Sequence, residues 1–272
     1  MLVMAPESHY KMKTASVTST TLLPDWMSEI GDQVLFMGTF ARNIFRSGFE
    51  WNELVRQCYV VGYKSIGLVG ITGFILGFVM TLQSVPTMKE FGAVSFVPSM
   101  VAISVIREIG PVIIALTCSG KIASSIGAEL GSMKVTEQID AMEVSGANPI
   151  QYLVVTRIIA CTLMVPLLTI LADTLALGGG FLGSNIGGHF SVILYFNKAF
   201  HSLAFTDLLP SFIKTIFFGF AIGFVGCYKG YNSGSGTESV GVAANSAVVS
   251  ASLWVIVLDA IAAQATTLLA YN

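Results

Sequence analysis

The chain contains five apolar segments that are each long enough to cross a lipid bilayer. The first, Ile66–Val85, holds twenty residues with no charge among them, and about twenty apolar residues span the hydrocarbon as a helix. The others are Phe96–Gly127, Ile158–Gly183, Leu208–Tyr228 and Val242–Ala270. Within lipid, one segment satisfies its own backbone hydrogen bonds only as a helix. Charged residues make up 11% of the chain, against about 25% in a soluble domain, so we expect an all-α integral membrane protein.

Two regions precede the first span. Residues 1–24 are polar and rich in Ser and Thr, and we expect a tail there with no cleavable signal peptide. Residues 25–63 have a helical pattern, with an apolar face of Trp26, Ile30, Val34 and Met37 opposite Glu29 and Asp32. This pattern predicts a helix at the membrane surface, and the alternative is a helix packed on the protein's own cytoplasmic side. Residues 25–272 then form one domain.

The positive charges predict the orientation of the chain. With the N-terminus in the cytoplasm, the inner side holds Lys11, Lys13, Arg42, Arg46, Arg56, Lys64, Lys121, Lys134, Arg157 and Lys229, and the outer side only Lys89 and Lys198. Cytoplasmic loops of membrane proteins carry an excess of Lys and Arg. Five spans then place the C-terminus outside.

One polar helix is expected between the second and third spans. Val135, Ile139 and Met142 follow each other at helical spacing and form an apolar stripe, while the other side is acidic. Gly146 and Pro149 are typical of a helix end. The sequence therefore predicts a continuous amphipathic helix over 129–144 on the cytoplasmic side. A solvated surface helix is the alternative to a helix that docks into a soluble partner.

Five ionisable residues lie inside the predicted spans: Arg107, Glu108, Asp173, Lys214 and Asp259. Each costs roughly 2.5–3.5 kcal/mol at mid-membrane on insertion scales, so they must face one another, a watery cavity or a polar ligand. Two hypotheses fit the residues equally. In one, the charges form ion pairs between helices that fix the packing. In the other, they line a polar chamber for a zwitterionic or anionic head group.

The sequence lacks the motifs that are typical of several classes of enzyme and nucleotide-binding protein. The chain has no GxxxxGK[ST], no HExxH and no GxSxG, and its glycine run GGGFLG (residues 178–183) ends an apolar segment, which indicates close helix packing. The cysteines, Cys58, Cys118, Cys161 and Cys227, lie in or beside apolar segments and show no ligand spacing. A net charge of −2 argues against nucleic acid. We expect no catalysis, no metal and no cofactor in this chain.

A resemblance adds to these inferences. The REIGP at 107–111, the AELGSMKVTEQIDAMEVSGANP that ends at Pro149 and the YLVVTRIIA that follows resemble the signature of MlaE-type permeases, the membrane subunits of ABC transporters that move phospholipid between membranes. The resemblance implies an interfacial helix, five transmembrane helices and a coupling helix. It also implies a homodimer, a separate ATPase that binds ATP and magnesium, and an MCE-domain lipid-binding partner. The location implied is a bacterial inner membrane or, alternatively, a plastid inner envelope.

The same resemblance assigns roles to particular residues. Arg107, Glu108, Lys214 and Asp259 match lipid-pocket positions, and the further pocket candidates beside them are Met80, Thr87, Met88, Phe91 and Ile109. Contacts to the ATPase are expected at Glu129, Lys134, Glu137, Asp140 and Glu143. Asp173 is expected to be structural. The alternative functions are an ion-coupled carrier or channel that uses the intramembrane charges, and a membrane enzyme with Glu108 or Asp259 as its acid or base.

Overall fold

The computed structural model describes residues 25–44, 50–188 and 190–271, and every element in these ranges is helical. The expected tail over 1–24 lies outside the described residues, as do Arg46 and the side chain of Trp26. Five helical segments are long and apolar enough to cross a membrane: Trp51–Glu90, Val94–Val135, Ile150–Ile186, Phe205–Tyr231 and Thr237–Leu268. The chain is thus an all-α integral membrane protein with five candidate spans.

Most spans are built from several helical pieces in series. The first joins α2 (Trp51–Val61), a 3₁₀ turn η1 (Tyr63–Ser65) and α3 (Ile66–Glu90). The second joins η2 (Val94–Phe96), α4 (Val97–Ser104), η3 (Val105–Ile109), α5 (Gly110–Cys118), η4 (Ser119–Ala123) and α6 (Ser124–Val135). The third joins η5 (Ile150–Val155) and α8 (Thr156–Gly188), and the last two are α10 (Phe205–Tyr231) and α11 (Thr237–Tyr271). The segments η3, η4 and η5 are π-helical.

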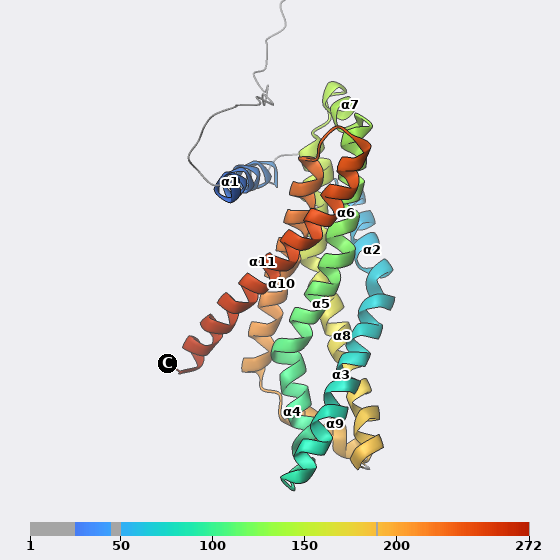
Figure 1. The fold of residues 1–272 in the computed structure, drawn as a ribbon, viewed down its shortest axis with the longest axis vertical. Helices are drawn as coiled ribbons and strands as arrows, with labels where there is room; N and C mark the ends of the chain where they lie inside the picture. The colour runs from blue at the N-terminus through green and yellow to red at the C-terminus, as the bar shows by residue number, and fades with distance from the viewer. Residues whose placement is uncertain (1–24, 45–49, 189, 272) are drawn as a thin grey trace, which may run out of the picture.

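Within the described ranges, three helices lie outside the spans, at different levels of the bundle (Figure 1). Helix α7 (Gln138–Val144) lies at one end, α9 (Val192–His201) lies at the opposite end beside α4, and α1 (Asp25–Ile44) lies across the side of the bundle. Rings of Phe36 and Phe40 on α1 contact aromatic rings of α10. Val34 and Leu35 point away and are 64% and 71% exposed. Helix α1 therefore packs on the protein with one face and leaves apolar side chains exposed on another, and its position at a membrane surface stays a prediction.

The region 51–63 differs from the sequence analysis, which placed it in the surface segment. In the structure it is α2 and the start of η1, and it runs on into α3 as the end of the first span. Gly62 keeps right-handed helical dihedral angles and its N–H donates to the carbonyl of Cys58, so the chain does not turn there. The polar residues of α2 therefore mark the end of a spanning helix rather than a helix along the surface.

Glycines bring the spanning helices into close contact, and this was predicted for the glycine run at 178–183. A methyl group on Gly73 or Gly77 of α3 would overlap the backbone of α8, and one on Gly179 would overlap the carbonyl of Phe74. Gly219 of α10 meets the carbonyl of Cys161 in the same way. Small residues let helix backbones approach in a membrane, where packing rather than hydrophobicity drives association. The third span thereby becomes the centre of the bundle, in contact with α2, α3 and α10.

Candidate functional site

The Arg107–Glu108 pair lies in a π-helical turn of the second span. The N–H of Gly110 donates to the carbonyl of Val105 instead of that of Ile106, and Pro111 has no N–H to offer. The carbonyl of Ile106 therefore loses its helical partner. The hydroxyl of Ser211 on α10 supplies one, at 2.7 Å. A π-bulge changes the direction of the side chains that it carries and is frequent at functional sites.

Lys214 connects three spanning helices at this bulge. Its Nζ lies 2.5 Å from Oε2 of Glu108 on the second span and 3.1 Å from Oδ1 of Asp259 on α11. The side chain of Lys214 is only 5% exposed, whereas Glu108 is 40% and Asp259 24% exposed. The structure thus brings together three of the four charged residues that were expected to meet a lipid. The two carboxylates are on the open side of this cluster, and the ammonium is behind them.

Arg107, the fourth of these residues, pairs with an acid that the sequence analysis missed. Its Nη1 lies 3.5 Å from Oδ1 of Asp207, in the first turn of α10. Asp207 precedes the segment that was expected to span the membrane, so it was read as part of a polar loop. The available signal was spacing, because Asp207, Ser211 and Lys214 recur at i, i+4 and i+7 and so occupy one face of α10. That whole face meets the bulge.

Asp173 lies on the other side of the bulge, on α8. Its Oδ1 is buried without a hydrogen-bond partner and lies where a side chain on Gly110 would be. No ion pair of Asp173 is present among the described residues. Its role, expected to be structural, stays a prediction.

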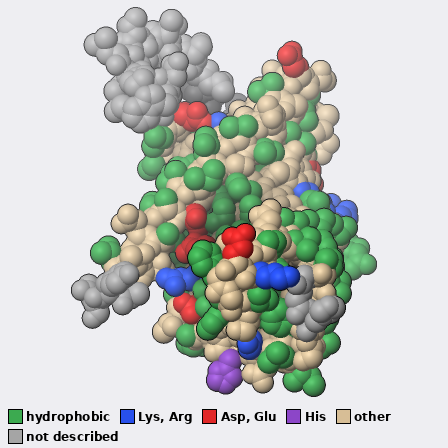
Figure 2. Space-filling model, turned by 60° about the horizontal axis from the view of Figure 1, so that its bottom comes forward, with side chains coloured by type: hydrophobic (Ala, Val, Ile, Leu, Met, Phe, Trp, Pro, Cys, Tyr) green, Lys and Arg blue, Asp and Glu red, His purple; other side chains and the backbone are tan. Residues whose placement is uncertain are grey.

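The further candidates for the lipid pocket differ in their surroundings. Met80 and Met88 on α3 pack, partly buried, against a cluster that includes Val101 and Val105 of the second span. Thr87 and Phe91 are exposed where α3 ends, and Ile109 is half-buried in the bulge beside Glu108. Figure 2, which brings the α9 end forward, shows acidic and basic side chains gathered amid apolar surface.

The predicted helix over 129–144 is wrong in its continuity. The structure ends α6 at Val135, and Glu137 adopts a left-handed conformation (φ 57°) before α7 begins at Gln138. The chain changes direction between α6 and α7, which allows Ile139 of α7 to be buried in the core. An ion pair between Lys134 of α6 and Asp140 of α7, at 3.0 Å, connects the two helices at this corner. The spacing of apolar residues matched one helix, although they belong to two.

The five residues expected to contact an ATPase therefore have different surroundings. Glu137 and Glu143 are exposed, and the side chain of Asp140 is 56% exposed. Glu129 instead lies 2.9 Å from Arg157, whose side chain is 2% exposed. This pair borders a polar cavity of about 460 Å³, which is lined by Glu53, Arg56, Glu129, Ser132, Met133, Gln138, Tyr152, Leu153 and Arg157. The pair joins the end of the second span to the start of the third.

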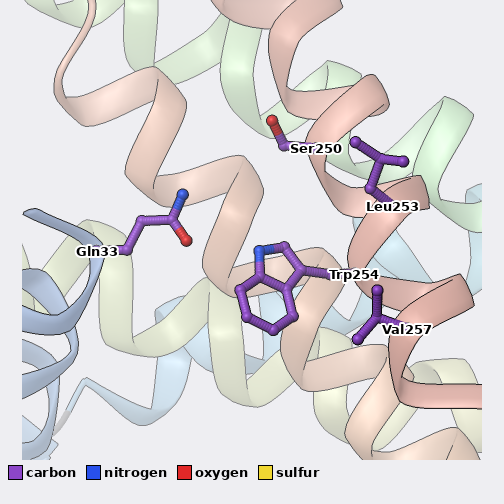
Figure 3. Close-up of a pocket in the computed structure, with 5 residues that line it drawn as sticks. All are labelled: Gln33, Ser250, Leu253, Trp254 and Val257. Carbon is purple, nitrogen blue, oxygen red and sulfur yellow. The ribbon is translucent and has the colours of Figure 1, made fainter. Parts of the chain in front are cut away.

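A second, more apolar cavity of about 230 Å³ lies between α1 and α11 (Figure 3). Gln33 reaches toward it from α1, and Ser250, Leu253, Trp254 and Val257 line it from α11. Neither cavity is lined by any of the four charged residues at the π-bulge. In the single chain Arg107, Glu108 and Asp259 are partly exposed, and Lys214 is buried behind the two carboxylates.

Comparison with known proteins gives consistent matches along most of the chain. The family model described as "Permease MlaE" matches residues 54–265. A "Probable ABC transporter permease protein" of Rickettsia felis is 35% identical over 84% of this chain and 88% of its own. A similarly described protein of Pyropia yezoensis is 33% identical over 76% of this chain and 79% of its own. The "Intermembrane phospholipid transport system permease protein MlaE" of Haemophilus influenzae is 30% identical over 88% of this chain and 96% of its own.

Proposed function

The chain belongs to the MlaE permease family of ABC transporters, and on that premise we propose that it moves phospholipid between its membrane and an MCE-domain partner. A separate ATPase subunit binds ATP and magnesium and drives the movement, so this chain is a non-catalytic membrane subunit without a cofactor of its own. Two copies of the chain form the working unit. The membrane is a bacterial inner membrane or, in the alternative, a plastid inner envelope.

The observation that carries this proposal is the exposure of the charges at the π-bulge. Ion pairs that only fixed the packing would be buried between helices, but the side chains of Arg107 and Glu108 are 43% and 40% exposed in the single chain. Exposed charges at this depth are too costly to face lipid. A second copy that covers this face encloses them in a polar chamber, with Met80 and Met88 nearby for acyl chains. Met side chains adapt to variable apolar partners.

The second span supplies a mechanical connection between the two ends of the molecule. It is helical without a break from Val94 to Val135, so the bulge with Arg107 and Glu108 and the corner before α7 belong to one rod. The exposed acids on and before α7, Glu137, Asp140 and Glu143, form the surface for the ATPase. When the ATPases close and push on α7, the second span moves, the chamber narrows and the lipid leaves toward the MCE-domain partner.

Purification of the chain from its native membrane in detergent, followed by mass spectrometry of proteins and lipids, tests this function. We expect an ATPase with a nucleotide-binding P-loop, an MCE-domain protein and phospholipid to copurify. Reversing charge with Glu137→Lys and Asp140→Lys should remove the ATPase but keep the lipid. The matched control is Glu90→Lys, an exposed acid at the opposite end, which should keep the ATPase. Transport without any ATPase would instead support the ion-coupled carrier or channel.

A further inference from the structure

We propose that the chamber selects phospholipids whose head group is zwitterionic and ends in a primary ammonium, such as phosphoethanolamine. This inference rests on the proposed function and specifies its substrate class. Its basis is that some of the charged side chains at the bulge are already paired within the protein, while others are exposed to a ligand.

The cluster of charged side chains at the bulge is not neutral. Arg107 and Lys214 carry two positive charges, and Glu108, Asp207 and Asp259 carry three negative ones. The cluster as a whole therefore has an excess of one negative charge. A ligand with a net negative charge adds to this excess in a region where unpaired charge is costly, whereas a zwitterion leaves the total unchanged.

The two cations of the cluster differ in their exposure. Lys214 is 5% exposed and already binds two carboxylates, so its ammonium is held behind them. Arg107 is 43% exposed, and its one ion pair is long, at 3.5 Å. A guanidinium has five N–H donors, so Arg107 keeps most of them for a ligand. Planar guanidinium groups bind phosphate through two parallel hydrogen bonds, which makes Arg107 the phosphate-binding group.

The two carboxylates that bind Lys214 can also accept hydrogen bonds from a ligand. Glu108 and Asp259 each bind Lys214 through one oxygen, and both are partly exposed. The second oxygen of each is available to a donor in the chamber. A primary ammonium has three N–H donors and matches two acceptors on neighbouring helices. Phosphoglycerol brings no cation to them, and the quaternary ammonium of phosphocholine has no N–H to donate.

The π-bulge fixes the order of these groups. Arg107 and Glu108 are adjacent in sequence, and Ser211 holds the bulge through the carbonyl of Ile106. Consecutive residues of the bulge thus offer a guanidinium and a carboxylate, and phosphoethanolamine likewise carries an anionic and a cationic group on one short head group. The head group binds with its phosphate at Arg107 and its ammonium at Glu108 and Asp259.

The test reconstitutes the full chain with its copurifying partners into vesicles with equal amounts of phosphatidylethanolamine, phosphatidylglycerol and phosphatidylcholine. The complex is then extracted in detergent, and the retained phospholipids are quantified by mass spectrometry. We expect phosphatidylethanolamine to be enriched roughly tenfold over the vesicle ratio, the factor that one charge-assisted hydrogen bond supplies. This measurement on the unmodified chain requires no variant to fold.

Variants then assign the selection to residues. Glu108→Gln and Asp259→Asn should each abolish most of the enrichment while phospholipid is still retained, and Arg107→Gln should lower the total amount of every phospholipid. Glu238→Gln, an exposed acid in the first turn of α11, is the control and should change neither value. Retention at the vesicle ratio, or enrichment of phosphatidylglycerol or phosphatidylcholine, would overturn the head-group inference and leave the proposed function standing. A chain that retains no phospholipid would overturn both.

Discussion

Replacing Lys214 with Met tests the charge cluster through stability. The two carboxylate oxygens lie 2.5 Å and 3.1 Å from the same nitrogen, so they can be no farther apart than the sum of these distances. Without the ammonium they repel each other by about 3 kcal/mol at an effective dielectric constant of 20. Partial exposure of Glu108 and Asp259 screens this repulsion, and we expect a net loss of about 2 kcal/mol.

The assay is thermal unfolding of the purified chain in detergent at neutral pH. For a chain of this size, about 2 kcal/mol lowers the midpoint by roughly 4–8 °C. Adding Asp259→Asn to Lys214→Met removes the repulsion and should restore most of that difference. Asp259→Asn alone keeps the pair between Lys214 and Glu108, so its own effect should be smaller than that of Lys214→Met.

The double-mutant cycle tests whether the two carboxylates share the ammonium, because it isolates the interaction free energy between positions 214 and 259. Lys214→Met could unfold at the same temperature as the unmodified chain. Alternatively, adding Asp259→Asn to Lys214→Met could lower the unfolding midpoint further instead of raising it. Either result would mean that the two carboxylates do not share the ammonium. The account of the cluster would then be wrong.

Three further substitutions test the packing and the other polar contacts. Gly77→Ala should cost roughly 2–3 kcal/mol in thermal unfolding because its methyl group overlaps α8. Gly67→Ala on the same helix has open space around it and should not destabilise the protein. Equal unfolding midpoints for the two variants would contradict the close approach of α3 and α8. Glu129→Gln should cost about 2 kcal/mol, less than the roughly 3–5 kcal/mol for breaking a fully buried pair, because the side chain of Glu129 is 42% exposed. Glu143→Gln should be neutral, and if both variants unfold alike, the pair has no structural role. Ser211→Ala should cost roughly 1–3 kcal/mol by leaving the bulge carbonyl unpaired, and an unchanged midpoint would show that the carbonyl has another partner.

The five spans were predictable because a membrane imposes strong local requirements on sequence. A run such as Ile66–Val85 has too few charges for a helix or strand of a soluble protein, and its length predicts a transmembrane helix. The close packing of the glycine run at 178–183 was also predictable, since small residues let helix backbones approach closely. The start of the first span was less visible, because the polar residues of α2 resemble those of a surface helix.

The corner before α7 was missed because its cause is not local. Val135, Ile139 and Met142 have the spacing of one helix, and neither glycine nor proline marks the break. The left-handed conformation of Glu137 is held by tertiary contacts, namely burial of Ile139 and the pair formed by Lys134. Such contacts override a helical pattern in ways that a single sequence does not display.

The charges at the bulge show the same division between local and long-range information. The cost of Arg107, Glu108, Lys214 and Asp259 in lipid was predictable, and so was their need for compensation. Their pairing was not, because Lys214 meets a residue more than a hundred positions earlier in the chain. Asp207 escaped notice because it lies just before an apolar segment, where an acid is unremarkable.

Photo-crosslinking tests the central claim, that this face of the molecule holds a phospholipid. A photoreactive amino acid at Ile109, beside Glu108, is compared with one at Leu167 on α8, which is 55% exposed. The full chain is purified with its partners in detergent, bulk lipid is washed away, and the samples are irradiated and analysed by mass spectrometry. The account predicts a phospholipid adduct at position 109 and none at 167. Adducts at both positions equally, or at neither, would contradict it.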